Sequence, residues 1–302
     1  MSNHKSSNFL PVSIQMDETL REFEFMPEDF VRVKQLIYQH AGISLNDSKQ
    51  SMVYSRLVRR LRATGTRSFK EYLNQLENHA APEWEHFINA LTTNLTSFYR
   101  EAHHFDMLAE QLKQLVHTRG TGTINIWCCA ASTGEEPYTI AITALEALGH
   151  QAQRVHVLAT DIDTNVLEIA QRGVYSDEQV KKVEPAIVQR YFLRGNGSNA
   201  GSIKVQQAVM DLLSFRRLNL LEQHWPIRAG FDAIFCRNVM IYFDKPTQNN
   251  LLKRFAPLLN QEGLLYVGHS ENFTQPNTPF RLRGKTVYEV LSSVAHVSSG
   301  GR

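Results

Sequence analysis

Carboxylates follow two apolar, β-prone runs in the middle of the sequence. Glu135 and Glu136 come after "INIWCC" and the small-residue loop "AASTG", and Asp161 ends "RVHVLATD", 27 residues after Gly134. A strand, a tight loop and a helix together form a nucleotide-type binding loop. The dinucleotide fingerprint G-x-G-x-x-G and the phosphate-loop pattern G-x-x-x-x-G-K-[ST] are both missing from this loop. Two carboxylates in the first helical turn would repel a phosphate and would accept a cation or a hydroxyl-rich group.

Asp161 indicates the kind of ligand that such a loop would hold. An acidic residue at the end of the second strand usually binds the hydroxyls of a ribose. A nucleoside without phosphates fits both features, and S-adenosylmethionine offers a ribose, an adenine and a positive sulfonium. Two structural alternatives are open at this point. Glu135 and Glu136 could simply favour the helix dipole, and Asp161 or Asp163 could simply cap the next helix.

Further polar side chains follow the later apolar runs. Asn219 and Leu220 lie in "RRLNLL", and Arg237, Asn238 and Tyr242 follow the run "FDAIFC". Polar residues that emerge from a buried strand are more often functional than structural. The segment "LTTNLTSFYRE" precedes the first strand, and by composition alone its polar residues are ordinary linker residues.

These residues need a scaffold that brings strand ends together. From about residue 120 the sequence alternates strand-like and helix-like segments, and the strand runs are apolar throughout. Such runs suit a parallel sheet covered on both faces, and the alternation predicts a doubly wound open α/β sheet. Ligands bind beyond the carboxyl ends of the strands in sheets of this kind. Residues 25–90 carry helical patterns with start and stop signals, which predict a small all-α domain.

Composition bounds the class of protein. A chain of 302 residues with 42% apolar and 21% charged residues suits a soluble protein of two domains, or of one domain with an appendage. A net charge of +2 calls for no nucleic acid. The cysteines, Cys128, Cys129 and Cys236, form no Cys-x-x-Cys pair, which argues for a reducing compartment and against a zinc site. Neither a membrane span nor a secretory signal is recognisable, so we expect a cytoplasmic protein without membrane insertion.

One predicted helix is strongly basic on one side. Between Lys49 and Lys70 there are seven Lys or Arg and no Asp or Glu. At about 100° per residue, Val53, Leu57 and Leu61 fall on one arc and the arginines on another. Because a solvated helix normally mixes charge signs, the basic arc predicts contact with an acidic protein surface or with nucleic acid, and few aromatics weaken the second option. The candidate docking residues are Arg56, Arg59, Arg60 and Arg62.

Taken together, these motifs resemble one known family. "TTNLTSFYRE", "AASTGEEPY", "ATDID", "RLNLL" and "CRNVMIYFD" occur in the order and spacing of the chemotaxis receptor glutamate methyltransferases, the CheR family, and the resemblance covers roughly residues 25–292. It implies an S-adenosylmethionine-dependent enzyme that methylates glutamate side chains on the cytoplasmic helices of chemoreceptors. The products would be γ-glutamyl methyl esters and S-adenosylhomocysteine, and no metal would take part.

The resemblance also assigns the site residues. The implied cofactor-binding positions are Asn94, Thr96, Arg100, Glu135, Glu136, Asp161, Asn219, Leu220, Arg237 and Asn238. Arg100 and Tyr242 are the candidate catalytic residues, and we assign both to positioning. A glutamate carboxylate has a pKa near 4.3, is already anionic at pH 7 and needs no strong base.

The implied domain organisation has five parts. We expect a flexible leader (1–24), a helical substrate-recognition domain (25–90), a linker with a connecting helix (91–119), a class I, Rossmann-like methyltransferase domain (120–292) and a flexible tail (293–302). A small β-subdomain would be inserted at about 191–216. In some family members that subdomain binds a short peptide at the receptor's C-terminus. We expect a monomer whose partner is the receptor.

Two other functions compete with this reading. An amino-methyltransferase acting on protein or nucleic-acid nitrogen commonly carries Asn-Pro-Pro-Tyr after the fourth strand, but here the segment is Asn238-Val239-Met240-Ile241-Tyr242. A CheR-like regulatory module without catalysis is the second alternative, and the intact set of motifs argues against it.

Overall fold

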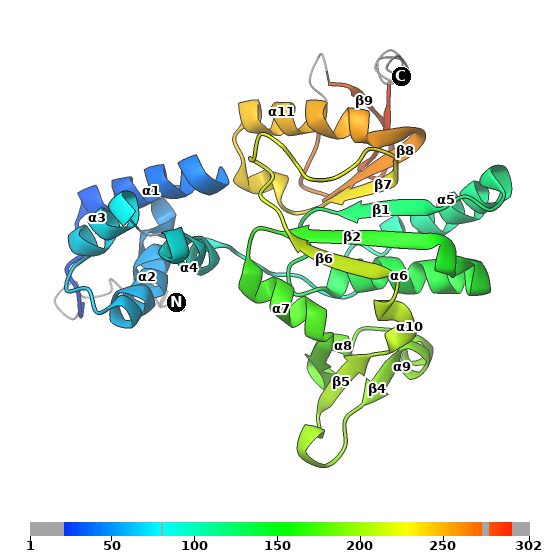
Figure 1. The fold of residues 1–302 in the computed structure, drawn as a ribbon, viewed down its shortest axis with the longest axis horizontal. Helices are drawn as coiled ribbons and strands as arrows, with labels where there is room; N and C mark the ends of the chain where they lie inside the picture. Colours follow the sequence, from blue (N-terminus) through cyan, green and yellow to red (C-terminus); the bar gives the residue numbers. More distant parts are fainter. Residues whose placement is uncertain (1–20, 80, 274–277, 292–302) are drawn as a thin grey trace, which may run out of the picture.

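The computed structural model describes residues 21–79, 81–273 and 278–291. The predicted leader and tail lie almost entirely outside these residues. An all-α domain and a larger α/β domain lie side by side (Figure 1). None of the described helices combines the length and apolarity needed to cross a membrane.

The first domain is a helical bundle. Pro27 stands at the first position of its first helix, and Gly42, in the left-handed region at φ 68°, ends that helix, as the start and stop signals predict. Leu57, Leu61 and Phe69 are fully buried in its core, so the apolar arc of the basic helix packs as expected. The helices are α1 (Pro27–Ala41), α2 (Gln50–Thr64), α3 (Phe69–His79) and α4 (Ala81–Leu91), with a short 3-10 turn, η2 (Asp47–Lys49), before α2.

The second domain is built on a seven-stranded sheet. The strands are β1 (Ile124–Cys128), β2 (Val155–Asp161), β6 (Leu213–Arg217), β7 (Phe231–Cys236), β8 (Leu259–Val267), β9 (Phe280–Gly284) and β10 (Val287–Val290). Their order is β6-β2-β1-β7-β8-β10-β9. The first five pair in parallel, and β10 is antiparallel to β8 and to β9. The predicted doubly wound sheet is thereby confirmed.

Helices cover both faces of the sheet. Leu108, Leu112 and Ile140 from α5 and α6 pack on one face, whereas Leu251 and Phe255 from α11 pack on the other. The strands are therefore buried on both sides, which explains their continuous apolar runs. The helices are α5 (His103–Arg119), α6 (Glu135–Leu148), α7 (Thr164–Arg172) and α11 (Lys245–Phe255). The arrowheads of β1 and β2 point towards the helical domain (Figure 1).

A small antiparallel sheet is inserted between α7 and β6. Its strands are β3 (Val174–Ser176), β4 (Phe192–Arg194) and β5 (Ser202–Val205), in the order β3-β5-β4, and it carries α8 (Asp177–Val180), α9 (Pro185–Tyr191) and α10 (Gln207–Met210). The expected range of about 191–216 is wrong at both ends. The sheet already includes β3, whereas β6 pairs with β2 in the main sheet. Helical segments separate β3 from its partners and hide the insertion's start.

Candidate active site

A cavity of about 320 Å³ lies where the helical domain meets the carboxyl ends of β1, β2 and β7. Its walls come from segments that are far apart in sequence, and this position agrees with the rule for doubly wound sheets. A cavity of this size can hold a small organic molecule. Of the predicted site residues, the lining includes Asn94, Thr96, Arg100, Glu136, Asp161, Asn219, Leu220, Arg237, Asn238 and Tyr242.

Asp161 lies at the end of β2 and fixes the loop after β1. Its Oδ2 accepts a hydrogen bond from the Ser132 amide at 2.8 Å, and its Oδ1 accepts one from the Asp163 amide at 3.0 Å. Burial raises the pKa of Asp161 to about 6, although these amide donors oppose the shift. A carboxylate with free lone pairs at the cavity wall can accept hydrogen bonds from ligand hydroxyls.

Asp163, rather than Asp161, caps the next helix. Its Oδ1 accepts hydrogen bonds from the amides of Asn165 and Val166 at 3.0 and 3.3 Å. Its Oδ2 accepts from Thr92 Oγ1 at 2.6 Å and from Asn94 Nδ2 at 2.7 Å. The capping alternative is therefore correct for Asp163. The same carboxylate also holds the linker that carries Asn94 against the sheet.

Arg237 sits at the floor of the site in a buried ion-pair group. Its Nη1 is 2.6 Å from Glu136 Oε2, and its Nη2 donates to the Arg100 carbonyl at 2.5 Å. Nη2 also lies 3.4 Å from Glu101 Oε2. Burial raises the pKa of Glu136 despite the neighbouring guanidinium. Because the arginine is fully buried between two carboxylates, it holds Glu136 and the Arg100 backbone in place.

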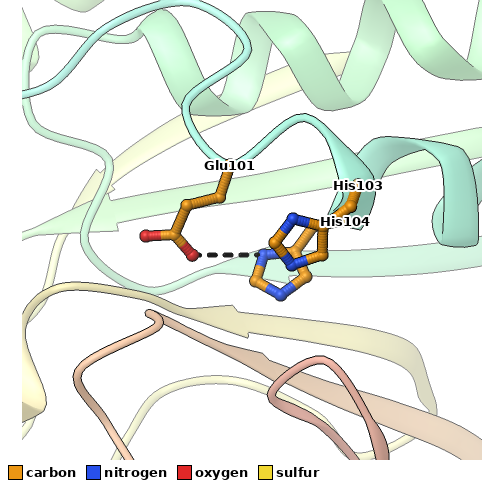
Figure 2. A group of neighbouring side chains, drawn as sticks. All are labelled: Glu101, His103 and His104. Carbon is orange, nitrogen blue, oxygen red and sulfur yellow. Dashed lines mark ion pairs between the residues drawn. The ribbon is translucent and has the colours of Figure 1, made fainter.

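Two histidines at the start of α5 lie next to this group (Figure 2). The donor atoms of Glu101, His103 and His104 lie within 4.8 Å of one another, with Glu101 Oε2 3.7 Å from His104 Nδ1. Burial, together with the positive charge of Arg237, lowers the pKa of His104 to about 4. Neutral imidazole and carboxylate are metal-ligand types. The Arg237 guanidinium already supplies positive charge to the same carboxylate oxygen and would repel a metal cation, so we assign the group to Arg237.

The loop after β7 is held by a residue that sequence reasoning missed. Glu271 is buried, and its Oε2 accepts from the amides of Asn238 and Gly268 at 2.9 and 2.6 Å, while Oε1 accepts from Ile241 at 3.3 Å. Asn238 is in the left-handed region at φ 57°, which needs such support. The only sequence signal was an acidic residue just after β8. Glu271 thereby fixes the loop that carries Tyr242 into the cavity.

Glu135 does not line the cavity, unlike its neighbour. Its carboxylate accepts hydrogen bonds from Thr133 Oγ1 at 2.6 Å and from Gln179 Nε2 at 3.3 Å, on the side of the inserted sheet. The expectation that Glu135 contacts the cofactor is therefore wrong for this geometry. Successive residues on a helix point about 100° apart, and here the Glu135 carboxylate turns to Thr133 and Gln179 whereas Glu136 turns to Arg237.

Asn219 lines the cavity, but its side chain joins the two domains. Its Nδ2 donates to the His40 carbonyl at 2.7 Å, and its Oδ1 accepts from the Leu221 amide at 2.9 Å. Next to this contact, a Cβ on Gly42 would come within 2.7 Å of Leu221 Cδ1. A larger residue would have to displace the Leu221 side chain and would be strained at φ 68°, so glycine is favoured where the two domains meet.

A second set of contacts continues this interface along the loop after β7. Tyr38 Oη donates to Asp244 Oδ2 at 2.6 Å, and the Ser44 amide donates to the Tyr242 carbonyl at 2.8 Å. The helical domain is therefore hydrogen-bonded to the segment that carries Tyr242. Its residues Ile43, Leu45, Lys49 and Met52 form part of the cavity wall.

The arginines of α2 are mostly engaged within the helical domain. Arg60 Nη2 lies 2.7 Å from Glu83 Oε2, and Arg62 is paired with Glu22. The expectation that no acid neutralises this arc is wrong, because the partners lie outside the segment from Lys49 to Lys70. Arg59 has no ion pair or hydrogen bond among the described residues.

Arg56 has a structural partner of another kind. Its Nη1 donates to the carbonyls of Ala90 and Thr92 at 3.3 and 2.5 Å. These carbonyls belong to the end of α4 and the start of the linker. Arg56 therefore anchors the linker that leads to Asn94 rather than presenting its full charge to a partner.

A doubly wound sheet with a cavity at its strand ends defines the class of Rossmann-like domains, which bind nucleotide-type ligands at that place. Residues 94–289 match the family described as "CheR methyltransferase, SAM binding domain", and residues 28–92 match "CheR methyltransferase, all-alpha domain". The chain belongs to the CheR methyltransferase family.

Curated relatives agree with this assignment. The chemotaxis protein methyltransferase of Klebsiella aerogenes is 55% identical over 86% of this chain and 88% of its own length. That of Salmonella typhimurium is 51% identical over 98% of this chain and 100% of its own length. The Escherichia coli protein is 53% identical over 86% and 89% of the two chains.

Proposed function

We propose that this protein transfers the methyl group of S-adenosylmethionine to the γ-carboxylate of glutamates on chemoreceptor helices, giving glutamate methyl esters and S-adenosylhomocysteine. The observation that carries this proposal is the cavity between the domains. It gathers Asn94 and Arg100 of the linker, Asp161 after β2 and Tyr242 after β7. Membership of a chemotaxis methyltransferase family supports the choice of substrate.

The lining suits the proposed cofactor. We assign Asp161 to the ribose hydroxyls, because its buried carboxylate has lone pairs at the cavity wall. The Arg100 guanidinium, whose Nη1 donates to the Leu95 carbonyl at 2.9 Å, retains further donors for a carboxylate. Glu136 and Arg237 neutralise each other and offer hydrogen-bonding groups at the floor. When bound, S-adenosylmethionine supplies a methyl group made electrophilic by its sulfonium.

Positioning and desolvation are the tasks left to the chain. The substrate carboxylate is anionic at neutral pH, so neither a general base nor a metal ion is required. Tyr242 would orient the attacking oxygen through its hydroxyl, and Arg100 would hold a carboxylate without displacing the reacting atoms. Apolar cavity walls would strip water from the nucleophile and shield it during transfer.

Transfer of radiolabelled methyl from S-adenosylmethionine to the cytoplasmic fragment of an Escherichia coli chemoreceptor tests this function. We expect label in the receptor that mild base releases as methanol. Label that is stable to base would indicate N-methylation and overturn the ester assignment. Cofactor binding without any transfer to receptor would favour the regulatory module instead.

The finer partner assignments are also proposals. We infer that the protein acts as a monomer in the cytoplasm, where receptor helices are accessible, and that nucleic acid is no partner. The inserted sheet offers β4 as an edge strand, on which Leu193 is 54% exposed, so a receptor C-terminal peptide could add to it as a further strand. Titration with receptor fragments that have and lack their last residues tests this, and equal affinities would contradict it.

A further inference from the structure

Two exposed apolar side chains stand at the cavity. Leu95 is 81% exposed and Ile241 is 50% exposed, and both line the cavity. The other large apolar side chains that are exposed on the described residues lie elsewhere: Met26, Val31, Tyr38, Val174, Leu193 and Leu282. An exposed leucine alone needs no explanation, but two apolar side chains at the entrance of a reaction site need one.

The backbone on either side of these side chains is fixed. The Leu95 carbonyl accepts the 2.9 Å hydrogen bond from Arg100, and the amide of Ile241 donates to Glu271. Leu95 lies between Asn94 and Thr96, and Ile241 directly precedes Tyr242. Both apolar groups are therefore held next to residues assigned to the reaction, while their side chains face solvent.

A cation completes this entrance. Lys49 lines the cavity, is exposed and has no ion pair or hydrogen bond through its ammonium group among the described residues. Arg59, another cation without a partner among the described residues, lies further along α2. Apolar contact next to an unpaired positive charge fits a partner that is apolar and acidic on the same face.

We propose that Leu95, Ile241 and Lys49 form the docking surface for the substrate helix. This inference rests on the proposed function and names where the receptor segment sits. The occupant is a helical segment whose reacting glutamate enters the cavity between apolar neighbours, with a second acidic residue near Lys49. Apolar packing at the entrance excludes water from the carboxylate, and the lysine selects the acidic segment.

Serine substitutions test the apolar pair. For Leu95→Ser, Ile241→Ser and the double variant, methylation kinetics are measured with the Escherichia coli receptor fragment. Each single change removes the burial of one large side chain, so we expect KM for the fragment to rise about tenfold. Cofactor affinity and melting temperature should match the wild type, because both side chains are exposed. Leu282→Ser is the matched control, because Leu282 is a 49% exposed leucine on β9. It should change neither KM for the fragment nor the affinity for the cofactor.

Charge reversal tests the third residue. Lys49→Glu should raise KM for the fragment and weaken its dependence on salt, whereas Lys253→Glu on α11 should do neither. Unchanged KM in the serine variants would overturn the docking surface while leaving the function intact, provided that the wild type makes base-labile esters. Lost cofactor affinity in Leu95→Ser would assign that side chain to the cofactor and also overturn the proposal. Failure of the wild type to form esters would instead refute the function.

Discussion

At the scale of single residues, the Asp161 carboxylate gives a pH-dependent prediction. Its pKa of about 6 means that the group is protonated at lower pH, and a protonated carboxyl loses acceptor capacity. We expect affinity for S-adenosylmethionine to be constant above pH 7 and to fall as pH drops through about 6. Calorimetric titration across this range tests it. Asp161→Ala should weaken binding by roughly 2–4 kcal/mol at pH 7.5 and remove the pH step.

If the affinity of the wild type for S-adenosylmethionine does not change between pH 5 and 7.5, Asp161 does not bind the cofactor as proposed. So would an Asp161→Ala variant that binds within twofold of the wild type. Asp177→Ala, at an exposed aspartate on α8, is the control for loss of a negative charge and should keep both the affinity and the pH step.

Tyr242 lends itself to a conservative test. Tyr242→Phe removes only the hydroxyl assigned to the attacking oxygen, so we expect turnover to fall roughly tenfold, the value of one hydrogen bond lost in the transition state. Cofactor affinity should stay within twofold. Single-turnover methylation and calorimetry measure the two effects. Tyr191→Phe is the control, because the Tyr191 hydroxyl bonds Glu146 outside the cavity and away from the domain interface. Unchanged turnover would reduce Tyr242 to a packing residue.

Individual site residues differ in how far the sequence could predict them. Asp161, Arg237 and Asn238 follow apolar runs directly, and strand-end position alone brings them to one cavity. The support from Glu271 and the contact of Asp163 with the linker could not be predicted, because their partners are backbone amides after β7 and the Asn94 side chain, which only the fold brings near. Glu135 was assigned wrongly because sequence spacing does not say which side of α6 faces the cavity.

At the scale of elements, α2 carries two neighbouring arginines, Arg59 and Arg60, to which we assign different roles. Arg59→Glu should lower receptor methylation at low substrate and flatten its salt dependence, because Arg59 is unpaired and steering is screened by salt. Arg60→Glu should instead lower stability by roughly 2 kcal/mol, since it leaves Glu83 without its partner and next to a like charge. Thermal unfolding and methylation across a salt series measure both.

The opposite pattern would overturn this division of tasks. A loss of several degrees in melting temperature for Arg59→Glu would make that residue structural. Normal salt-dependent methylation by the same variant would make it an ordinary solvated side chain. Periodicity predicted the buried arc of α2 correctly but could not predict the pairing, because the acids of Arg60 and Arg62 come from α4 and from the residues before α1.

At the scale of the whole molecule, His104 affects acid stability. Its pKa is lowered to about 4 in the folded protein, from an ordinary value near 6.5. Between pH 4 and 6.5 this histidine is protonated in the unfolded chain but neutral in the folded protein. Its contribution to the free energy of unfolding is therefore fully present above pH 6.5 and is lost as pH falls towards 4. The contribution is at most about 3 kcal/mol. We expect His104→Gln to lose less stability than the wild type over this range.

Urea unfolding of both proteins at pH 7, 5.5 and 4.5 measures the difference. If the wild type and His104→Gln lose the same free energy of unfolding as the pH falls, His104 is not the group that causes the acid-induced loss of stability. His103→Gln is the matched control, since that neighbouring imidazole is partly exposed. Comparing variants at each pH matters because buried carboxylates such as Glu136 change stability in the opposite direction.

The sequence indicates both domains and the sheet, because local periodicity determines them. It does not indicate how the domains meet. The hydrogen bonds of Tyr38 to Asp244 and of His40 to Asn219 join residues more than a hundred positions apart, and neither pair carries a local signal. The predicted start of the inserted sheet, at about residue 191, lies too far along the sequence for the same reason, because β3 pairs with β5 only across intervening helices.

The shared cavity constrains how this protein can recombine with its relatives. The two family matches meet at residue 93, so a gene exchange at that point looks like the transfer of an intact module. Yet Leu45 and Met52 from one side and Asp161 and Arg237 from the other line the same chamber. A hybrid would inherit half of its chamber from each parent, together with a Gly42 contact fitted to a leucine that the other parent need not supply. Successful hybrids should therefore be those whose parents match at residues 38–52 and 219–244, whatever their identity elsewhere.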